Sequence, residues 1–236
     1  HFIMGDLPGQ GQTSRAQKGQ IDDFNTYHEN ILAWIKIDNE YKIPTFVLGV
    51  GLGGLIILNL LEKTELPIEG ILLFSPMLEL KRDYKGRKNK LISNVGKISK
   101  DTRFKVGITP HDLTRNDEII EETANDGLML KKVTYSWYNL INEKMKETMD
   151  HIRDIKPISA LIMYGTKDKI LETQSINEMK DKLKSKEMYF KVWDGLYHEI
   201  HNEPERDLVM RYVLSFLNNS VNTMGFIVNE EEIEDI

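Results

Sequence analysis

Short apolar segments alternate along most of the chain with segments whose apolar residues recur at helical spacing. The pattern predicts strands at residues 2–4, 45–48, 70–74, 159–164 and 188–192. It predicts helices at residues 24–39, 55–62, 174–183 and 206–217. Alternation of this kind is typical of an α/β fold, in which helices cover both faces of a mainly parallel sheet.

One long segment interrupts this alternation. Residues 81–154 are charged and helical in pattern, with no convincing strand, and we expect them to form a helical cap above the carboxyl edge of the sheet. The core is then predicted to comprise residues 1–80 and 155–218, followed by an acidic tail at 219–236. The chain starts with His1, and the following apolar residues resemble the end of a strand, so we expect amino-terminal strands to be missing from this sequence.

The most informative segment is TFVLGVGLGGLIIL at residues 45–58, which predicts a buried strand that turns sharply into a helix. A nucleophile elbow, GxSxG, is found at such a turn and holds a serine at its tip. In this sequence the middle position of the pattern is Gly51. The turn is therefore either an elbow without its serine or a loop of another kind.

A dinucleotide-binding loop is the other interpretation of the same glycines. Gly49, Gly51 and Gly54 satisfy the GxGxxG spacing between a strand and a helix. That fold places an acidic residue at the end of the next strand, but here this strand ends in the residues FSP. A strand and a helix also precede the loop, whereas the fingerprint usually opens its domain. The dinucleotide interpretation is the less favoured one.

Two further polar segments follow predicted strands, YGTKDKI at 164–170 and DGLYHEIHNE at 194–203. The order of elbow, acid and histidine is the chain order of the α/β-hydrolase triad, which predicts that Asp168 orients His198 and that His198 acts as general base. His201 is the neighbouring alternative for the histidine. Asp168 has a structural alternative, because an aspartate after a strand often caps the next helix.

Five segments occur in order along the chain: DLPGQGQTSR, FVLGVGLGG, LTRNDEIIEETANDGLML, MYGTKDKI and GLYHEIHNEPER. Together they resemble the bacterial lysophospholipase and monoacylglycerol lipase branch of the α/β-hydrolases. The resemblance implies serine hydrolase chemistry on esters of single-chain acyl lipids such as lysophospholipids, with no cofactor. It also implies that Gly51 stands at the nucleophile position, with Asp168 and His198 as its partners and the backbone N–H of Leu52 as oxyanion donor.

The departure at position 51 changes the expected activity. The elbow of this family usually reads GHSMGG, and glycine has no atom that His198 could activate. We therefore expect a hydrolase scaffold that is inactive or nearly so. The alternative is a pseudohydrolase that binds a lipid or a partner without catalysis.

The cap offers two candidate contacts. Leu128, Met129 and Trp137 are candidates to line an acyl-chain pocket, although such residues also form the core of a cap. Residues 81–105 contain ten Lys or Arg in a chain of net charge −6. This basic stretch either contacts an anionic membrane surface from the periphery or is simply a solvated face.

Composition excludes several classes of protein. The chain of 236 residues has no cysteine, which excludes disulfides, a thiolate nucleophile and cysteine-ligated metals. Its negative charge argues against nucleic-acid binding by the whole chain. No apolar run approaches the roughly 18 to 20 residues that cross a bilayer. We expect a protein of the cytoplasm, since a cysteine-free chain suits a reducing compartment, although it also suits export from a bacterium.

Overall fold

The computed structural model describes residues 2–13, 17–81 and 102–218. The predicted acidic tail at 219–236 and most of the basic stretch, residues 82–101, lie outside the described residues.

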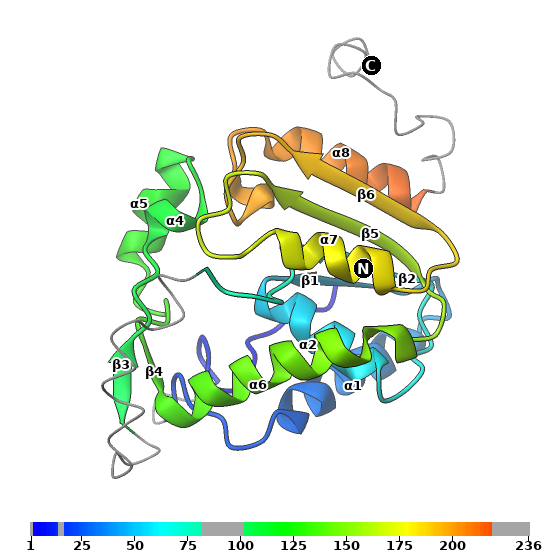
Figure 1. The fold of residues 1–236 in the computed structure, drawn as a ribbon, viewed down its shortest axis with the longest axis horizontal. Helices are drawn as coiled ribbons and strands as arrows, with labels where there is room; N and C mark the ends of the chain where they lie inside the picture. The colour runs from blue at the N-terminus through cyan, green and yellow to red at the C-terminus, as the bar shows by residue number, and fades with distance from the viewer. Residues whose placement is uncertain (1, 14–16, 82–101, 219–236) are drawn as a thin grey trace.

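A parallel sheet of four strands forms the centre of the fold (Figure 1). Its order is β1 (Phe46–Val50), β2 (Gly70–Phe74), β5 (Ser159–Gly165) and β6 (Met188–Trp193). The predicted α/β class is confirmed, and four of the five predicted strands are found within two residues of their expected ends.

The strand predicted at residues 2–4 is wrong. These residues belong to no strand, and the side chains of Phe2 and Met4 are 93% and 82% exposed. Their apolar character reproduces the strand pattern, but no described strand pairs with them.

Helices cover both faces of the sheet, as predicted. The side chains of β2 alternate between the two faces: Ile71 and Leu73 belong to one buried cluster, and Leu72 and Phe74 to the other. Helix α8 (Arg206–Leu217) packs on the second cluster. The first cluster is covered by α1 (Asn25–Asn39), α2 (Leu52–Leu61), α6 (Tyr135–His151) and α7 (Gln174–Lys182).

Helix α2 is buried on all sides from Gly54 to Leu61. It lies against β1, α1 and α6, so no side of the helix faces solvent over this length. A helix that is apolar all round is stable only in such a position. The packing therefore fixes the direction in which the chain leaves β1.

The inserted segment contains more strand than its sequence predicts. β3 (Arg103–Lys105) and β4 (Lys132–Thr134) form a separate antiparallel pair, so the expectation of no strand between 81 and 154 is wrong. Strands of three residues are too short to give a periodic signal.

Two helices of the insertion, α4 (Pro110–Leu113) and α5 (Asp117–Asn125), lie beyond the carboxyl ends of β5 and β6 (Figure 1). Its last helix, α6, packs instead on α2, and the short 3-10 helix η2 (Ile152–Asp154) leads on to β5. The boundary between core and cap stays a prediction. No helix in the described parts of the chain combines the length and apolar character needed to cross a bilayer.

Two glycines near the start of α2 should respond oppositely to alanine. A Cβ at position 49 would lie 2.6 Å from the backbone carbon of Gly53, whereas a Cβ at position 53 meets nothing within 4 Å. We expect Gly49→Ala to lower the free energy of unfolding by about 1–3 kcal/mol because of overpacking. The matched Gly53→Ala, inside the helix, should leave it unchanged or raise it by up to about 1 kcal/mol. Urea denaturation of both variants measures the contrast, and equal losses would contradict this packing.

A second prediction concerns Glu62, at the carboxyl end of α2. Burial raises the pKa of this carboxyl from 4.5 to about 7, against the opposing hydrogen bond with Thr148. A folded-state pKa above the unfolded value favours the protonated form, so its contribution to stability is present below pH 4.5 and is lost as pH rises through 7. We expect Glu62→Gln to become progressively more stable than the parent between pH 4.5 and 8. Thermal unfolding over this range checks the trend, and a difference that does not grow with pH would contradict it.

Candidate active site

The turn between β1 and α2 has the backbone shape of a nucleophile elbow. Gly51 has φ 52° and ψ −113°, a conformation that side-chain-bearing residues rarely adopt. Its N–H donates to the carbonyl of Phe74 at 3.0 Å, and its own carbonyl accepts from the N–H of Met77 at 2.9 Å. These hydrogen bonds thus join the turn to the end of β2 and to the loop that follows β2.

The other glycines of the segment allow close packing. A Cβ at Gly49 would collide with the first turn of α2, and one at Gly54 would lie 2.8 Å from the Cβ of Pro76. The GxGxxG spacing therefore has a local explanation, in which two glycines let the strand, the helix and the next loop approach one another.

Gly51 faces the ring of His198. A Cβ built at position 51 would lie 3.1 Å from Nε2 of His198 and 3.7 Å from its Cε1. The histidine thus stands where it could take a proton from a side chain at this position. Position 51 itself supplies no such side chain.

Asp168 and His198 are hydrogen-bonded through the opposite side of the ring. Nδ1 of His198 lies 2.8 Å from Oδ2 of Asp168, and both side chains are buried. Oδ1 of Asp168 accepts from the N–H groups of Ile170 and Leu171 at 2.8 and 2.9 Å. Burial acts to raise the pKa of Asp168, but the hydrogen bond and charge of His198 and the two backbone N–H groups together lower it below its ordinary value.

The carboxylate of Asp168 therefore has two functions in the structure. One oxygen orders the loop after β5, which is the capping alternative seen in the sequence, and the other oxygen holds the imidazole. This arrangement favours the tautomer of His198 with a proton on Nδ1 and leaves Nε2 turned toward Gly51.

Two further residues form hydrogen bonds to the backbone carbonyls of Asp168 and His198. Ser75, buried at the end of β2 with φ 42°, donates from its hydroxyl to the backbone carbonyl of His198 at 2.8 Å. The ammonium group of Lys81 donates to the backbone carbonyl of Asp168. Both contacts join segments about 90 to 120 residues apart, so no local sequence pattern reveals them.

Glu203 joins the histidine loop to the cap. Its carboxylate is fully buried and accepts from the N–H of Tyr197 at 2.6 Å and from Nε of Arg115 at 3.0 Å. Arg115 lies between α4 and α5, and its guanidinium also pairs with Glu205. Sequence reasoning missed both residues of this contact, although Glu203 belongs to the segment HNEPER, whose density of charge was its only local signal.

Neighbouring contacts strengthen the same junction. The N–H of Glu199 donates to the carbonyl of Leu113, at the end of α4, at 2.8 Å. Nζ of Lys169 donates to the carbonyl of His111 at 2.9 Å and lies 4.0 Å from the centre of the Tyr197 ring. The cap is thus fixed to both loops that carry the Asp168–His198 pair.

His198, and not the alternative His201, is hydrogen-bonded to Asp168, and the buried Nδ1 of His201 has no hydrogen-bond partner among the described residues. His201 lies in η3 (Ile200–Asn202), with its ring centre 6.0 Å from that of Phe74. Burial lowers the pKa of His201, Glu199 opposes this shift, and His198 adds to it. Such an environment favours a neutral ring packed in the interior.

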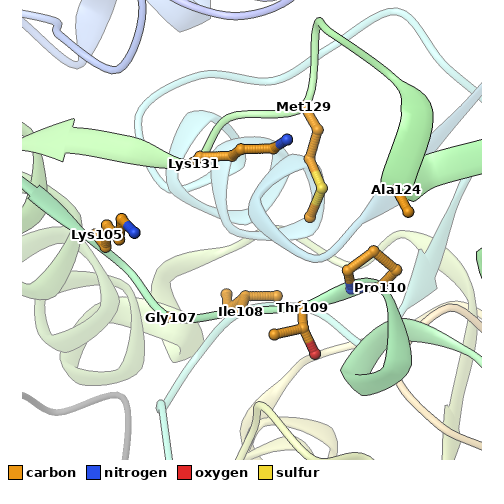
Figure 2. A pocket seen from close by; sticks show the side chains of 8 residues that line it. All are labelled: Lys105, Gly107, Ile108, Thr109, Pro110, Ala124, Met129 and Lys131. Carbon is orange, nitrogen blue, oxygen red and sulfur yellow. The ribbon is translucent and has the colours of Figure 1, made fainter.

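The remaining residues predicted for the site differ in their exposure and in their contacts. The N–H of Leu52 is at the first position of α2, where a backbone N–H has no carbonyl partner within its own helix. Leu128 is 39% exposed, and Met129 lines a cavity of about 340 Å³ in the cap (Figure 2). Trp137 donates from its indole N–H to the hydroxyl of Tyr27 at 2.9 Å, which ties the start of α6 to α1.

Among the described residues, no group of three or more histidine, aspartate or glutamate side chains is placed to hold a metal ion. The site consists of a histidine that can exchange a proton at Nε2, a carboxylate that orients it, and backbone N–H groups at the start of a buried helix. These are the parts of an acyl-transfer site apart from its nucleophile.

The sequence of the chain is similar to those of known proteins. Residues 1–205 match the family model described as serine aminopeptidase, S33 (Hydrolase_4). Phospholipase YtpA of Bacillus subtilis (strain 168) is 31% identical over 222 residues, which cover 94% of this chain and 85% of that protein.

Solved structures agree with the fold. The monoacylglycerol lipase of Paleococcus ferrophilus has a TM-score of 0.78 at 22% identity, covering 90% of this chain and 80% of that one. A soluble variant of monoglyceride lipase from Saccharomyces cerevisiae, in complex with a substrate analog, has a TM-score of 0.79 at 19% identity, covering 91% and 75%. With four parallel strands, an elbow-shaped turn and these matches, the chain belongs to the serine aminopeptidase S33 family of α/β-hydrolases, in its lysophospholipase and monoacylglycerol lipase branch.

Proposed function

We propose that the chain is a carboxylic-ester hydrolase scaffold for single-chain acyl lipids, of lysophospholipase type, whose turnover is near background because position 51 is glycine. The observation that carries the proposal is the geometry at Gly51. Its Cβ position lies 3.1 Å from Nε2 of a histidine that Asp168 already orients, yet no oxygen is present there to attack an ester.

With serine at position 51, the chemistry would be complete. The serine hydroxyl would attack the ester carbonyl while Nε2 of His198 accepts its proton, and the N–H of Leu52 would stabilise the oxyanion. Collapse of this intermediate would expel the alcohol, which takes the proton from His198. Water would then release the fatty acid by the same steps and regenerate the serine.

The class of substrate follows from the relatives. Phospholipase YtpA and the monoacylglycerol lipases are named for acting on phospholipids and monoacylglycerols, and this chain is similar to them over most of its length. Both classes supply a carboxylic ester on an acyl chain. An acyl lipid or lysophospholipid is accordingly the proposed ligand of the site.

A non-catalytic role is the second candidate, and the same glycine favours it. A scaffold that keeps its elbow, its Asp168–His198 pair and its cap can bind an acyl lipid without cleaving it. Binding of a lysophospholipid without turnover, by a chain whose Gly51→Ser variant is active, would identify this role.

Peripheral contact with a membrane through residues 81–105 is also proposed, on the basis of the ten basic residues in the sequence. Of its described members, Lys81 is engaged with Asp168 and Arg103 with the carbonyl of Lys18, which leaves Lys105 exposed. Co-sedimentation with anionic vesicles, absent with neutral vesicles and weakened by salt, would support it.

The first test is the matched pair Gly51→Ser and Gly51→Ala. We expect the serine variant to hydrolyse a short acyl ester at least about 10³-fold faster than the parent, because the nucleophile is the missing group. The alanine variant should stay at background. Both substitutions should lower the free energy of unfolding by about 1–3 kcal/mol, since position 51 keeps a backbone conformation that disfavours side chains.

The serine variant needs a control for the origin of its activity. Adding His198→Ala to it should return the rate to background. A folded serine variant without activity, or a parent chain with ordinary enzymatic turnover, would overturn the proposal.

The orienting role of Asp168 can be tested in the serine variant. We expect Asp168→Asn to reduce turnover by up to about 10⁴-fold, because an amide no longer favours the tautomer of His198 that leaves Nε2 free to accept a proton. The loss should be in kcat rather than in KM, as measured by steady-state ester hydrolysis. Asp194→Asn, on the exposed turn after β6, is the matched control and should leave both constants unchanged.

A further inference from the structure

The cap contains a cavity of about 340 Å³ that the proposed chemistry does not use (Figure 2). It lies between the segment that runs from β3 into α4 and the segment from the end of α5 to β4. Its volume is within the roughly 300–1,000 Å³ typical of small-molecule sites. The lining residues are Lys105, Gly107, Ile108, Thr109, Pro110, Ala124, Met129 and Lys131.

The apolar and the basic residues line different parts of the cavity. Ile108, Pro110, Ala124 and Met129 supply apolar surface. In Figure 2 the two lysines stand on one side of the view, and Ala124 and Pro110 stand on the other. A surface of this kind suits a ligand with an apolar chain at one end and negative charge at the other.

The position of the lysines follows from the pairing of β3 with β4. Lys105 lies directly opposite Lys132 in this pair, and Lys131 precedes Lys132. Like charges placed opposite each other on paired strands repel, so this register concentrates unfavourable positive charge at one end of the cap. Neither Lys105 nor Lys131 forms an ion pair with another residue in the described ranges.

Two carboxylates in the segments that line the cavity, Asp112 and Asp126, are hydrogen-bonded to backbone N–H groups, and Asp126 accepts from the N–H of Leu128 at 2.7 Å. Asp112 accepts hydrogen bonds from the N–H and the hydroxyl of Thr109, at 2.8 and 2.6 Å, and so caps α4. Its charge is committed to the start of that helix, whereas the two lysines have exposed side chains. An anion held beside Lys105 would relieve its repulsion with Lys132.

We propose that this cavity binds a single-chain amphiphile with an anionic head, with the chain against Ile108, Pro110 and Met129 and the head between Lys105 and Lys131. The anion is a carboxylate if the ligand is a free fatty acid and a phosphate if it is a lysophospholipid. Both present oxygen acceptors to ammonium donors. Binding here needs neither a nucleophile nor the Asp168–His198 pair, so the inference goes beyond the proposed function.

The cavity is connected to the candidate active site through α4. Thr109 and Pro110 line the cavity at the start of this helix, and Leu113 at its end accepts the N–H of Glu199, the residue after His198. Four helical residues span only about 6 Å. A ligand in the cap therefore rests on the same short helix that supports the histidine loop.

The test is calorimetric titration of the full chain with dodecyl phosphate, dodecanoate and neutral dodecyl maltoside, each below its micelle concentration. We expect at least one of the two anionic probes to bind at least about tenfold more tightly than the neutral probe. The double variant Lys105→Gln, Lys131→Gln should abolish this preference. The tighter anionic probe identifies the head group as phosphate or carboxylate.

Two variants locate the site. Lys184→Gln removes an equal charge from the exposed loop between α7 and β6, outside the lining of the cavity, so it should change the affinity for the anionic probes by less than about twofold. Ala124→Trp, on the exposed side of α5, should fill the cavity and weaken all three probes. Thermal unfolding verifies that each variant is folded.

Equal affinity of the parent and the double lysine variant for the anionic probes would overturn the proposal, as would equal affinity of the parent for charged and neutral probes. These titrations use the chain with Gly51 in place. Their outcome is therefore separate from the esterase test of the serine variant, and either proposal can fail without the other.

Discussion

The turn that carries the chain from β1 into α2 constrains the rest of the site. α2 is buried against β1, α1 and α6, and the chain turns sharply at Gly51 to enter it. Hydrogen bonds to Phe74 and Met77 hold that residue at φ 52° although it has no side chain to position. The turn is thus maintained by the packing of the core and not by the chemistry that such turns usually serve.

Two buried carboxylates organise the loops around this turn. Asp168 satisfies two backbone N–H groups and one histidine, and Glu203 satisfies Tyr197 and Arg115. A buried carboxylate is stable only where several donors surround it, so each one fixes the loop that supplies them. The histidine stays in place for reasons of folding, which explains how a site can keep its geometry when its nucleophile position is glycine.

Local patterns predict the elements of this fold well and their contacts poorly. Four strands, four helices, the elbow turn at Gly51 and the placing of Asp168 and His198 at one edge all follow from apolar periodicity and the order of short motifs. Periodicity also misleads, because residues 2–4 have the composition of a strand but no described partner. The pairs that brace the site, such as Lys81 with Asp168 and Arg115 with Glu203, join distant segments, and nothing in either segment alone specifies them.

The ion pair between Arg115 and Glu203 holds the cap on the loop that carries His198. Separating these residues would leave a fully buried carboxylate without its counter-charge, at a cost of about 3–5 kcal/mol. The ion pair therefore couples the position of the segment between α4 and α5 to the loop that carries His198, although Arg115 itself takes no part in the chemistry.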